Sequence, residues 1–212
     1  MVLSIKKPEL LIVTDNQGNV SYGGKQSWYH SKWAVEAGCG ATCGSNILAY
    51  LGLTRECFRP LYHPTGMGKE SFLSHMNEVY QAIKPGLLGV NRVAMFVNGI
   101  DKFAKSRGID LKCHILSVDF WTKQKRTREK LIDFVQMAIK LDSPIAFLVL
   151  SKGKEIQLSS WHWVTIIGVD IDKEHVYAHA LDNGKKIKFD LQLWFLSTRM
   201  HGGLIYFEQK SG

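Results

Sequence analysis

The 212-residue chain has little cysteine, and the cysteines it has lack the spacings of structural sites. The four are Cys39, Cys43, Cys57 and Cys113, and no two of them form a C-x-x-C pair. Their intervals match neither a disulfide framework nor a zinc site. These absences exclude a small disulfide-stapled module and favour a compartment that keeps thiols reduced. We therefore expect a cytoplasmic protein without a metal or another cofactor.

Long apolar runs are also missing. A membrane span needs about 18 consecutive apolar residues, and the chain contains no such run. Near the amino terminus the apolar stretch at 9–13 is too short for the core of a signal peptide, and no small-residue cleavage site follows it. No membrane partner is expected, although a leader removed earlier would leave no trace. Since neither repeats nor linkers are visible, residues 1–212 are expected to form one domain.

Acidic residues are outnumbered, which leaves a formal net charge of +8 and raises the question of nucleic acid. The densest basic run comprises Lys123, Lys125, Arg126, Arg128 and Lys130, and a second cluster comprises Lys185, Lys186 and Lys188. Neither lies in a known nucleic-acid motif, and no aromatic residues are interleaved for stacking. We expect solvated surface at both places, with an anion-binding patch as the alternative, and no nucleic-acid partner.

Helical patterns dominate the first two thirds of the chain. Apolar spacing and end signals predict one helix from Cys39 to about residue 51 and further helices at 69–84, 91–107 and 128–140. Short strands are expected at 9–14 and 109–118, and the Gly- and aromatic-rich stretch at 21–33 is expected to be an ordered loop.

The last third is rich in strand signals. Strands are expected at 145–150, 161–169, 175–182, 185–190 and 203–208, with Asn183-Gly184 as a two-residue hairpin turn. Helices followed by strands indicate an α+β fold. We expect a helical part, about 39–140, packed on a twisted antiparallel sheet formed by about 145–208.

One short segment suggests a nucleophile. Gly38-Cys39-Gly40 places a cysteine between two glycines at the expected start of a helix. Glycines lack Cβ atoms, so a substrate could approach the sulfur closely. Unpaired N–H groups at a helix start favour a thiolate and can bind an oxyanion. Cys39 is the candidate nucleophile, with a tightly packed apolar residue as the alternative, and Cys43 is expected in the core.

A base for this thiol is expected far away in the sequence. His162 lies between Trp161 and Trp163 at the start of an apolar strand, where a histidine is costly to bury without a hydrogen bond. We predict His162 as the base, with an ordinary core or rim histidine as the alternative and His179, on the next strand, as its rival. The histidines expected at the surface are His30, His63 and His75.

The third group follows from the expected hairpin. If 162–170 pairs antiparallel with 175–182 about residue 172, position 162 falls opposite Asp182 or Asn183. Either side chain can accept the imidazole N–H and fix the tautomer. Asn183 is typical turn material, so Asp182 is the favoured orienting residue and Asn183 the alternative.

Three segments occur in the order Cys, His, Asp/Asn: GCGATCGSNILAYL at 38–51, SSWHWVTIIGVD at 159–170 and ALDNGKKIKFDLQLWF at 180–195. In this respect the chain resembles the papain-like cysteine peptidase superfamily, and more closely its bacterial branch related to bacteriocin-processing (double-glycine) peptidases. The segment SYGGKQSWYHSKW at 21–33 resembles the approach to the nucleophile in these bacterial proteins.

The resemblance implies a thiolate–imidazolium pair, a covalent acyl-enzyme, and an oxyanion hole made by the Cys39 N–H and a glutamine. Gln26 is the candidate, although its 13-residue interval to Cys39 is longer than usual, so that the residues between must fold back. The sequence around Asp182 also differs from the Asn-Ser-Trp-Gly of papain itself. We thus expect a cysteine peptidase with a peptide or protein substrate. A papain-like amidase, deamidase or acyltransferase and a non-catalytic binding module are the alternatives.

Overall fold

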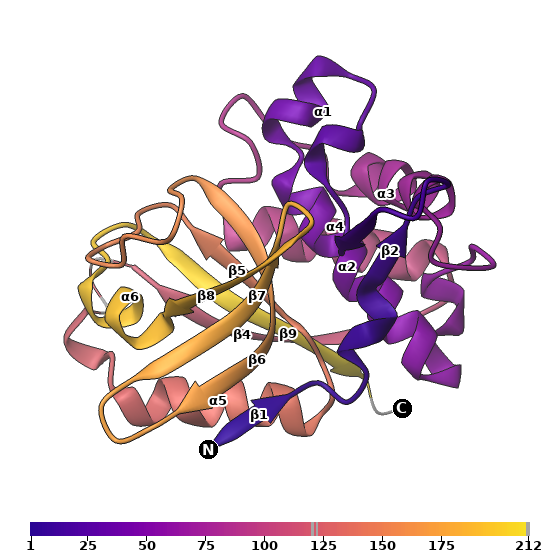
Figure 1. The fold of residues 1–212 in the computed structure, drawn as a ribbon. Coiled ribbons are helices and arrows are strands. Elements are labelled where there is room, and N and C mark those ends of the chain that lie inside the picture. The colour runs from indigo at the N-terminus through magenta and orange to yellow at the C-terminus, as the bar shows by residue number, and fades with distance from the viewer. Residues whose placement is uncertain (120, 122, 211–212) are drawn as a thin grey trace.

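In the computed structural model, which describes residues 1–119, 121 and 123–210, a group of helices packs against a twisted antiparallel sheet (Figure 1). The helical side contains α1 (Lys32–Ala37), α2 (Cys39–Thr54), α3 (Lys69–Ala82) and α4 (Val93–Ser106), with 3-10 helices at Gln26–Trp28 and Glu56–Leu61. The α+β class expected from the sequence is confirmed.

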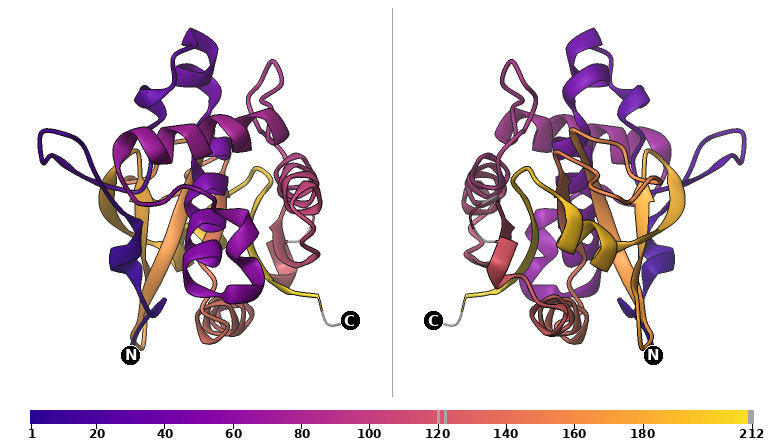
Figure 2. Two further views of the ribbon diagram at one scale, coloured as in Figure 1. Left: turned by 90° about the vertical axis from the view of Figure 1, so that its right-hand side faces the viewer. Right: turned by 90° about the vertical axis from the view of Figure 1, so that its left-hand side faces the viewer.

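The main sheet has seven strands and is antiparallel throughout. Six of them follow the order β4 (Leu111–Val118), β9 (Gly202–Gln209), β5 (Ile145–Val149), β6 (His162–Ile171), β7 (Val176–Asp182) and β8 (Lys185–Asp190), while β1 (Val2–Ser4) pairs with the far end of β6. A separate hairpin of β2 (Ile12–Thr14) and β3 (Val20–Tyr22) projects from the side of the molecule (Figure 2).

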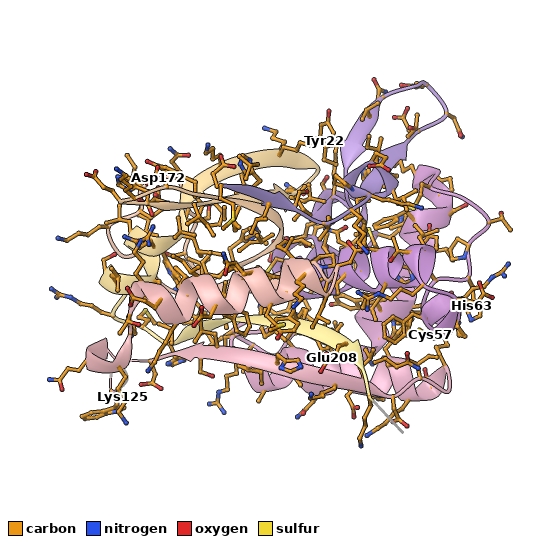
Figure 3. The ribbon with its side chains drawn as sticks, turned by 90° about the horizontal axis from the view of Figure 1, so that it is seen from below. Tyr22, Cys57, His63, Lys125, Asp172 and Glu208 are labelled. Carbon is orange, nitrogen blue, oxygen red and sulfur yellow. The ribbon has the colours of Figure 1, made fainter. Side chains whose placement is uncertain are left out.

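Both faces of the sheet are covered by other elements, which explains why the sequence of the central strand β5 is apolar throughout. In β5, Ala146 and Leu148 pack toward the helical side, whereas Phe147 and Val149 pack with α5 (Arg128–Lys140) and α6 (Leu191–Ser197). Figure 3 shows α5 lying across the sheet in the view from below. Alternate residues of a strand point to opposite faces, so every residue of this strand is buried.

Helix α2 lies at the centre of the molecule and sets the position of the site. Every residue from Gly40 to Leu51 is buried, because the helix packs on β5 and β6 on one side and on α3 and α4 on the other. A helix that is apolar all round belongs in a core. Its first residue, Cys39, therefore lies near the end of the sheet at which β6 begins.

Several elements differ from the sequence-based predictions. The stretch expected as a strand at 9–14 begins with a 3-10 helix at Pro8–Leu11, because proline is favoured in a first helical turn. The expected loop at 21–33 contains β3 and the start of α1, whose cap Ser31 accepts a hydrogen bond from the Ala34 N–H. Helix α6 was not predicted, although Asp190 caps it in the same way. Helix α5 and strand β4 belong with the sheet rather than with the helices around α2.

The basic run that leads into the first turn of α5 is not a uniformly solvated surface. Arg126 is buried, and its guanidinium donates to the carbonyl oxygens of Phe195 and Thr198 at the end of α6. Arg128 donates to Gln192 of the same helix. The side chain of Lys123 lies outside the described part of the chain. Over the described residues, no helix has the length and apolar character needed to cross a membrane.

His75 also departs from its prediction, because its side chain is buried rather than at the surface. It lies among aromatic rings, and its Nε2 is 3.2 Å from the carbonyl oxygen of Ser45. Burial lowers the pKa of His75 to about 4, so that the ring is neutral near pH 7.

Candidate active site

The candidate nucleophile lies where two helices meet. Cys39 is the first residue of α2, and only Gly38 separates it from the end of α1. The flanking glycines serve internal packing rather than the approach of a substrate: a Cβ at Gly38 would collide with Ala34 and Tyr29, and one at Gly40 would lie 2.9 Å from Cβ of Val90. Cys39 itself is partly exposed and lines a pocket.

His162 and Asp182 lie in the same pocket as Cys39. His162 begins β6 and Asp182 ends β7, and Nε2 of the imidazole donates to Oδ1 of the carboxylate over 2.6 Å. The Cys39 thiol lines the same pocket and lies close enough to the imidazole to raise its pKa. Because Nε2 is engaged by Asp182, Nδ1 is the ring nitrogen left for the sulfur. The structure thus aligns the three predicted residues as thiol, imidazole and carboxylate.

The surroundings of His162 favour its charged form. Burial alone would lower the pKa of the imidazole. The hydrogen bond to Asp182 and the charges of Asp182 and Cys39 raise it by more than burial lowers it, so the pKa is about 10. The side chains of His162 and Asp182 are only about a fifth to a quarter exposed, at 21% and 24%. A protonated imidazole near pH 7 is the state that can pair with a thiolate.

Gln26 reaches the pocket because the residues between it and Cys39 are folded into helices. The 3-10 helix Gln26–Trp28 and α1 take up the long interval, and Gln26 and Cys39 line the same pocket. The Gln26 side chain donates through Nε2 to the Val35 carbonyl over 2.6 Å. Its backbone N–H donates to Oδ1 of Asn183 over 2.9 Å.

The side chain of Asn183, the alternative orienting residue, therefore accepts from Gln26, whereas His162 donates to Asp182. It has a positive φ of 45°, and Gly184 follows with a φ of 80°, so the two residues form the β7–β8 turn as the sequence predicts. This commitment to the turn leaves Asp182 as the acceptor for the imidazole.

The rival base lies elsewhere. His179 points to the Asp170 carboxylate, 2.9 Å from its Nε2, and Lys188 binds the same carboxylate. These three residues form a polar cluster on β6, β7 and β8, and none of them lines the Cys39 pocket.

The other cysteines have different surroundings. Cys43 is buried one turn after Cys39, and burial raises the pKa of its thiol to about 12. Burial likewise raises the pKa of Cys113 to about 12. Cys57 is exposed, but it lies toward the helical end of the molecule, at the opposite end of the view from Asp172 in the β6–β7 turn (Figure 3). Neither Cys57 nor Cys113 lines the pocket of His162, and Cys43 lies buried beneath Cys39.

Two features of the site were not predicted from the sequence. Asn46 and Thr165 line the pocket beneath Cys39, and both are buried. Polar residues at central positions of an apolar helix and strand were the available signal for them. On the other side of Cys39 lies a cavity of about 270 Å³ with a largely apolar lining. The exposed apolar side chains around this cavity are Trp33, Leu87, Leu88 and Trp161.

The backbone before His162 is unusual. Trp161 has a positive φ of 58° although it is not glycine, and half of its side chain is exposed beside the cavity. Such conformations are costly and gather at functional sites. Within the described residues, no group of three or more His, Cys, Asp and Glu side chains is placed to hold a metal ion.

The helices around α2 and the antiparallel sheet make an α+β fold of the papain-like class. Among solved structures, the chain is similar to the crystal structure of UfSP from C. elegans, a papain-like cysteine protease of the UFM1-specific protease family. The match has a TM-score of 0.52 and 11% identity, and it covers 99% of this chain and 34% of that one. At this identity the likeness concerns the fold. No protein-family model matches the chain, and no curated protein matches it either.

Proposed function

We propose that the chain is a cysteine peptidase that hydrolyses peptide bonds through an acyl-enzyme on Cys39. The observation that carries this proposal is the alignment of Cys39, His162 and Asp182 in one pocket, with 2.6 Å between imidazole and carboxylate. A nucleophile, a base in hydrogen-bond contact with it and a third group that orients the base are the parts that acyl transfer needs. The papain-like fold supports the same reading.

In the first half of the proposed reaction, the Cys39 proton passes to Nδ1 of His162, and the thiolate attacks the carbonyl carbon of the substrate. The carbonyl oxygen becomes an oxyanion, which the Cys39 N–H at the start of α2 and the Gln26 side chain would stabilise. When the C–N bond breaks, the imidazolium gives its proton to the departing amine, and a thioester to Cys39 remains.

Water completes the cycle in the second half. His162 takes a proton from water, the hydroxide attacks the thioester carbonyl, and the C–S bond breaks to release a carboxylic acid and the Cys39 thiolate. Asp182 holds the imidazole by its Nε2–H, keeps Nδ1 directed at the sulfur and stabilises the positive ring. Water and the substrate supply every atom of the products, so the proposal requires no cofactor.

A peptide or protein is the proposed substrate, and an extended chain could pass through the 270 Å³ cavity beside Cys39. The motifs at 38–51, 159–170 and 180–195 favour the bacterial branch related to bacteriocin-processing peptidases. We also place the protein in the cytoplasm, because its four cysteines are free and would stay reduced there.

The proposal can be tested by incubating the purified chain with a library of quenched fluorescent peptides and with a simple activated ester. We expect peptide cleavage by the wild type and an acyl adduct on Cys39 in the intact mass. Cys39→Ala should show neither, while Cys57→Ala is the matched control that keeps both. An acyl adduct that goes only to an added amine would indicate an acyltransferase. A wild-type chain that forms no adduct and cleaves no peptide would favour a non-catalytic binding module.

A further inference from the structure

A chain of buried polar side chains runs beneath the Cys39 pocket, with Asn46 at its centre. Asn46 follows Cys39 by seven residues, nearly two helical turns, so both lie on the same face of α2. Its Oδ1 accepts the backbone N–H of Gly24 over 2.9 Å, and its Nδ2 donates to Oγ1 of Thr165 over 3.1 Å. Asn46 thereby joins the segment that leads to Gln26 to the strand that begins with His162.

The direction of this chain of hydrogen bonds is consistent from end to end. Thr165 accepts from Asn46 and gives its own hydroxyl proton to Sγ of Cys43, 3.4 Å away. Cys43 in turn donates to the carbonyl oxygen of Val164 over 3.3 Å. Because each hydroxyl or thiol proton is committed, the Asn46 amide is fixed with its oxygen toward Gly24.

Steric contact fixes the same segment. Gly23, with a φ of 74°, packs so closely on Asn46 that a Cβ there would lie 2.7 Å from Oδ1. Two residues after Gly24, the Gln26 N–H is held by Asn183. The segment 23–26 is thus held at Gly24 by α2 and at Gln26 by the β7–β8 turn.

We propose that Asn46 is a positioning residue for the oxyanion site: it sets the place of the 23–26 segment, and thereby of the Gln26 side chain, relative to Cys39 and His162. This inference rests on the proposed function, in which Gln26 is an oxyanion donor. A small displacement of such a donor weakens stabilisation of the transition state without removing the nucleophile.

A purely structural role for Asn46 predicts a different result, because loss of a buried hydrogen bond would lower stability and damage all reactions of Cys39 alike. Two reactions separate these roles. Acylation by an activated ester such as p-nitrophenyl acetate forms an oxyanion, whereas alkylation by iodoacetamide displaces iodide from a saturated carbon and forms none. Only the first reaction depends on Gln26.

The experiment compares Asn46→Leu, Thr165→Val and Gln26→Ala with the wild type, using both reagents on the full chain. The matched control is Ser45→Ala, which removes a buried hydrogen bond of the same helix, 2.8 Å to the Ala41 carbonyl, without touching the 23–26 segment. Thr165→Val keeps the shape of its side chain and serves if Asn46→Leu fails to fold. Thermal unfolding is recorded for every variant.

We expect Asn46→Leu to lower the acylation rate about 10- to 100-fold while alkylation of Cys39 changes less than about 2-fold. Thr165→Val should show a smaller effect of the same kind, and Ser45→Ala should show none. In a Gln26→Ala background, Asn46→Leu should lower the acylation rate little further, because both substitutions act through the same oxyanion donor.

Folded variants with normal acylation, an equal fall in both reactions, or additive losses with Gln26→Ala would each overturn the positioning role alone. A wild-type chain alkylated at Cys39 but never acylated would overturn the proposed function, and this inference with it.

Discussion

Nε2 of His162 donates to Oδ1 of Asp182 over 2.6 Å, although the two residues are not partners in the ladder between β6 and β7. The last paired residues of that ladder are Thr165 and Leu181, and the register shifts between Ile166 and Gly168. His162 and Asp182 therefore meet on a diagonal beyond the last pair. Since side chains diagonal across two strands remain within reach of each other, the contact needs only a long polar pair at the ends of the strands.

The Asp182 carboxylate is expected to affect turnover by orienting the imidazole of His162. Asp182→Ala should lower kcat by on the order of 10- to 1000-fold, because His162 loses the group that fixes its orientation and charge while Cys39 stays in place. Steady-state kinetics on a cleaved peptide measure this. The loss should remain smaller than that of Cys39→Ala, and an Asp182→Ala enzyme with wild-type kcat would remove Asp182 from the site.

The raised pKa of His162 predicts a dependence of stability on pH. The imidazole has a pKa of about 10 in the folded chain, above its unperturbed 6.5. Its contribution to the free energy of unfolding is therefore complete below about pH 6.5 and is lost as the pH rises through about 10. Asp182→Asn removes the partner charge, so the pKa of His162 should be lower in this variant. Its free energy of unfolding should then fall less as the pH rises. Urea unfolding of the wild type and of Asp182→Asn at pH 6, 8 and 10 measures this difference. Equal losses of stability in the two proteins would show that Asp182 does not raise the pKa of His162.

Cys39 should be the one hyperreactive thiol of the four. It shares its pocket with His162, whereas burial raises the pKa of Cys43 and Cys113, and Cys57 is exposed outside that pocket. Limited iodoacetamide near pH 6, followed by peptide mass spectrometry, should find the label first on Cys39. Earlier labelling of Cys57 would show that the pocket does not activate its thiol.

The two histidines on β6 and β7 provide a matched pair of variants. His162→Ala should abolish turnover and leave the fold intact, because the thiol loses its base and the leaving group its proton donor. His179→Ala should keep its activity, since that ring contacts Asp170 outside the pocket. Turnover and circular dichroism of both variants check this, and the reverse pattern would show that the base is His179.

The sequence allowed Cys39 and His162 to be predicted as neighbours because both residues occur in segments with strong local signals. Cys39 begins a helix and His162 begins an apolar strand, so each could be recognised without knowledge of the tertiary fold. The partner Asp182 was also found by counting along a hairpin, but the register was wrong. Ile171 pairs with Val176, so the hairpin is centred between residues 173 and 174 rather than at 172. The irregularity near Ile167 moves the pairing back by only one residue, and nothing in the apolar sequence around it marks that shift.

Other parts depended on contacts that a linear pattern cannot contain. The glycines beside Cys39 were interpreted as room for a substrate, yet they make room for Val90, Tyr29 and Ala34. Helix α1 was missed because the Gly- and aromatic-rich stretch that leads into it resembled a loop, although the cap at Ser31 was visible. Asn46 could be seen as a polar residue in an apolar helix, but its partners come from residues more than 20 and 100 positions away.

Asn183 has two roles, one through its backbone in the β7–β8 turn and one through its side chain as an acceptor for Gln26. Different substitutions separate these roles. Its backbone has a φ of 45° in the turn, and its side chain accepts the Gln26 N–H. Asn183→Ala should cost about 1 kcal/mol or less of the free energy of unfolding, since alanine tolerates this conformation less well. Asn183→Gly, which accepts a positive φ but has no side chain, should recover most of that stability. In both variants kcat should fall less than in Asp182→Ala, because the imidazole keeps its carboxylate. Urea unfolding and kcat are measured on all three, and a folded but inactive Asn183→Ala beside a fully active Asp182→Ala would make Asn183 the orienting residue.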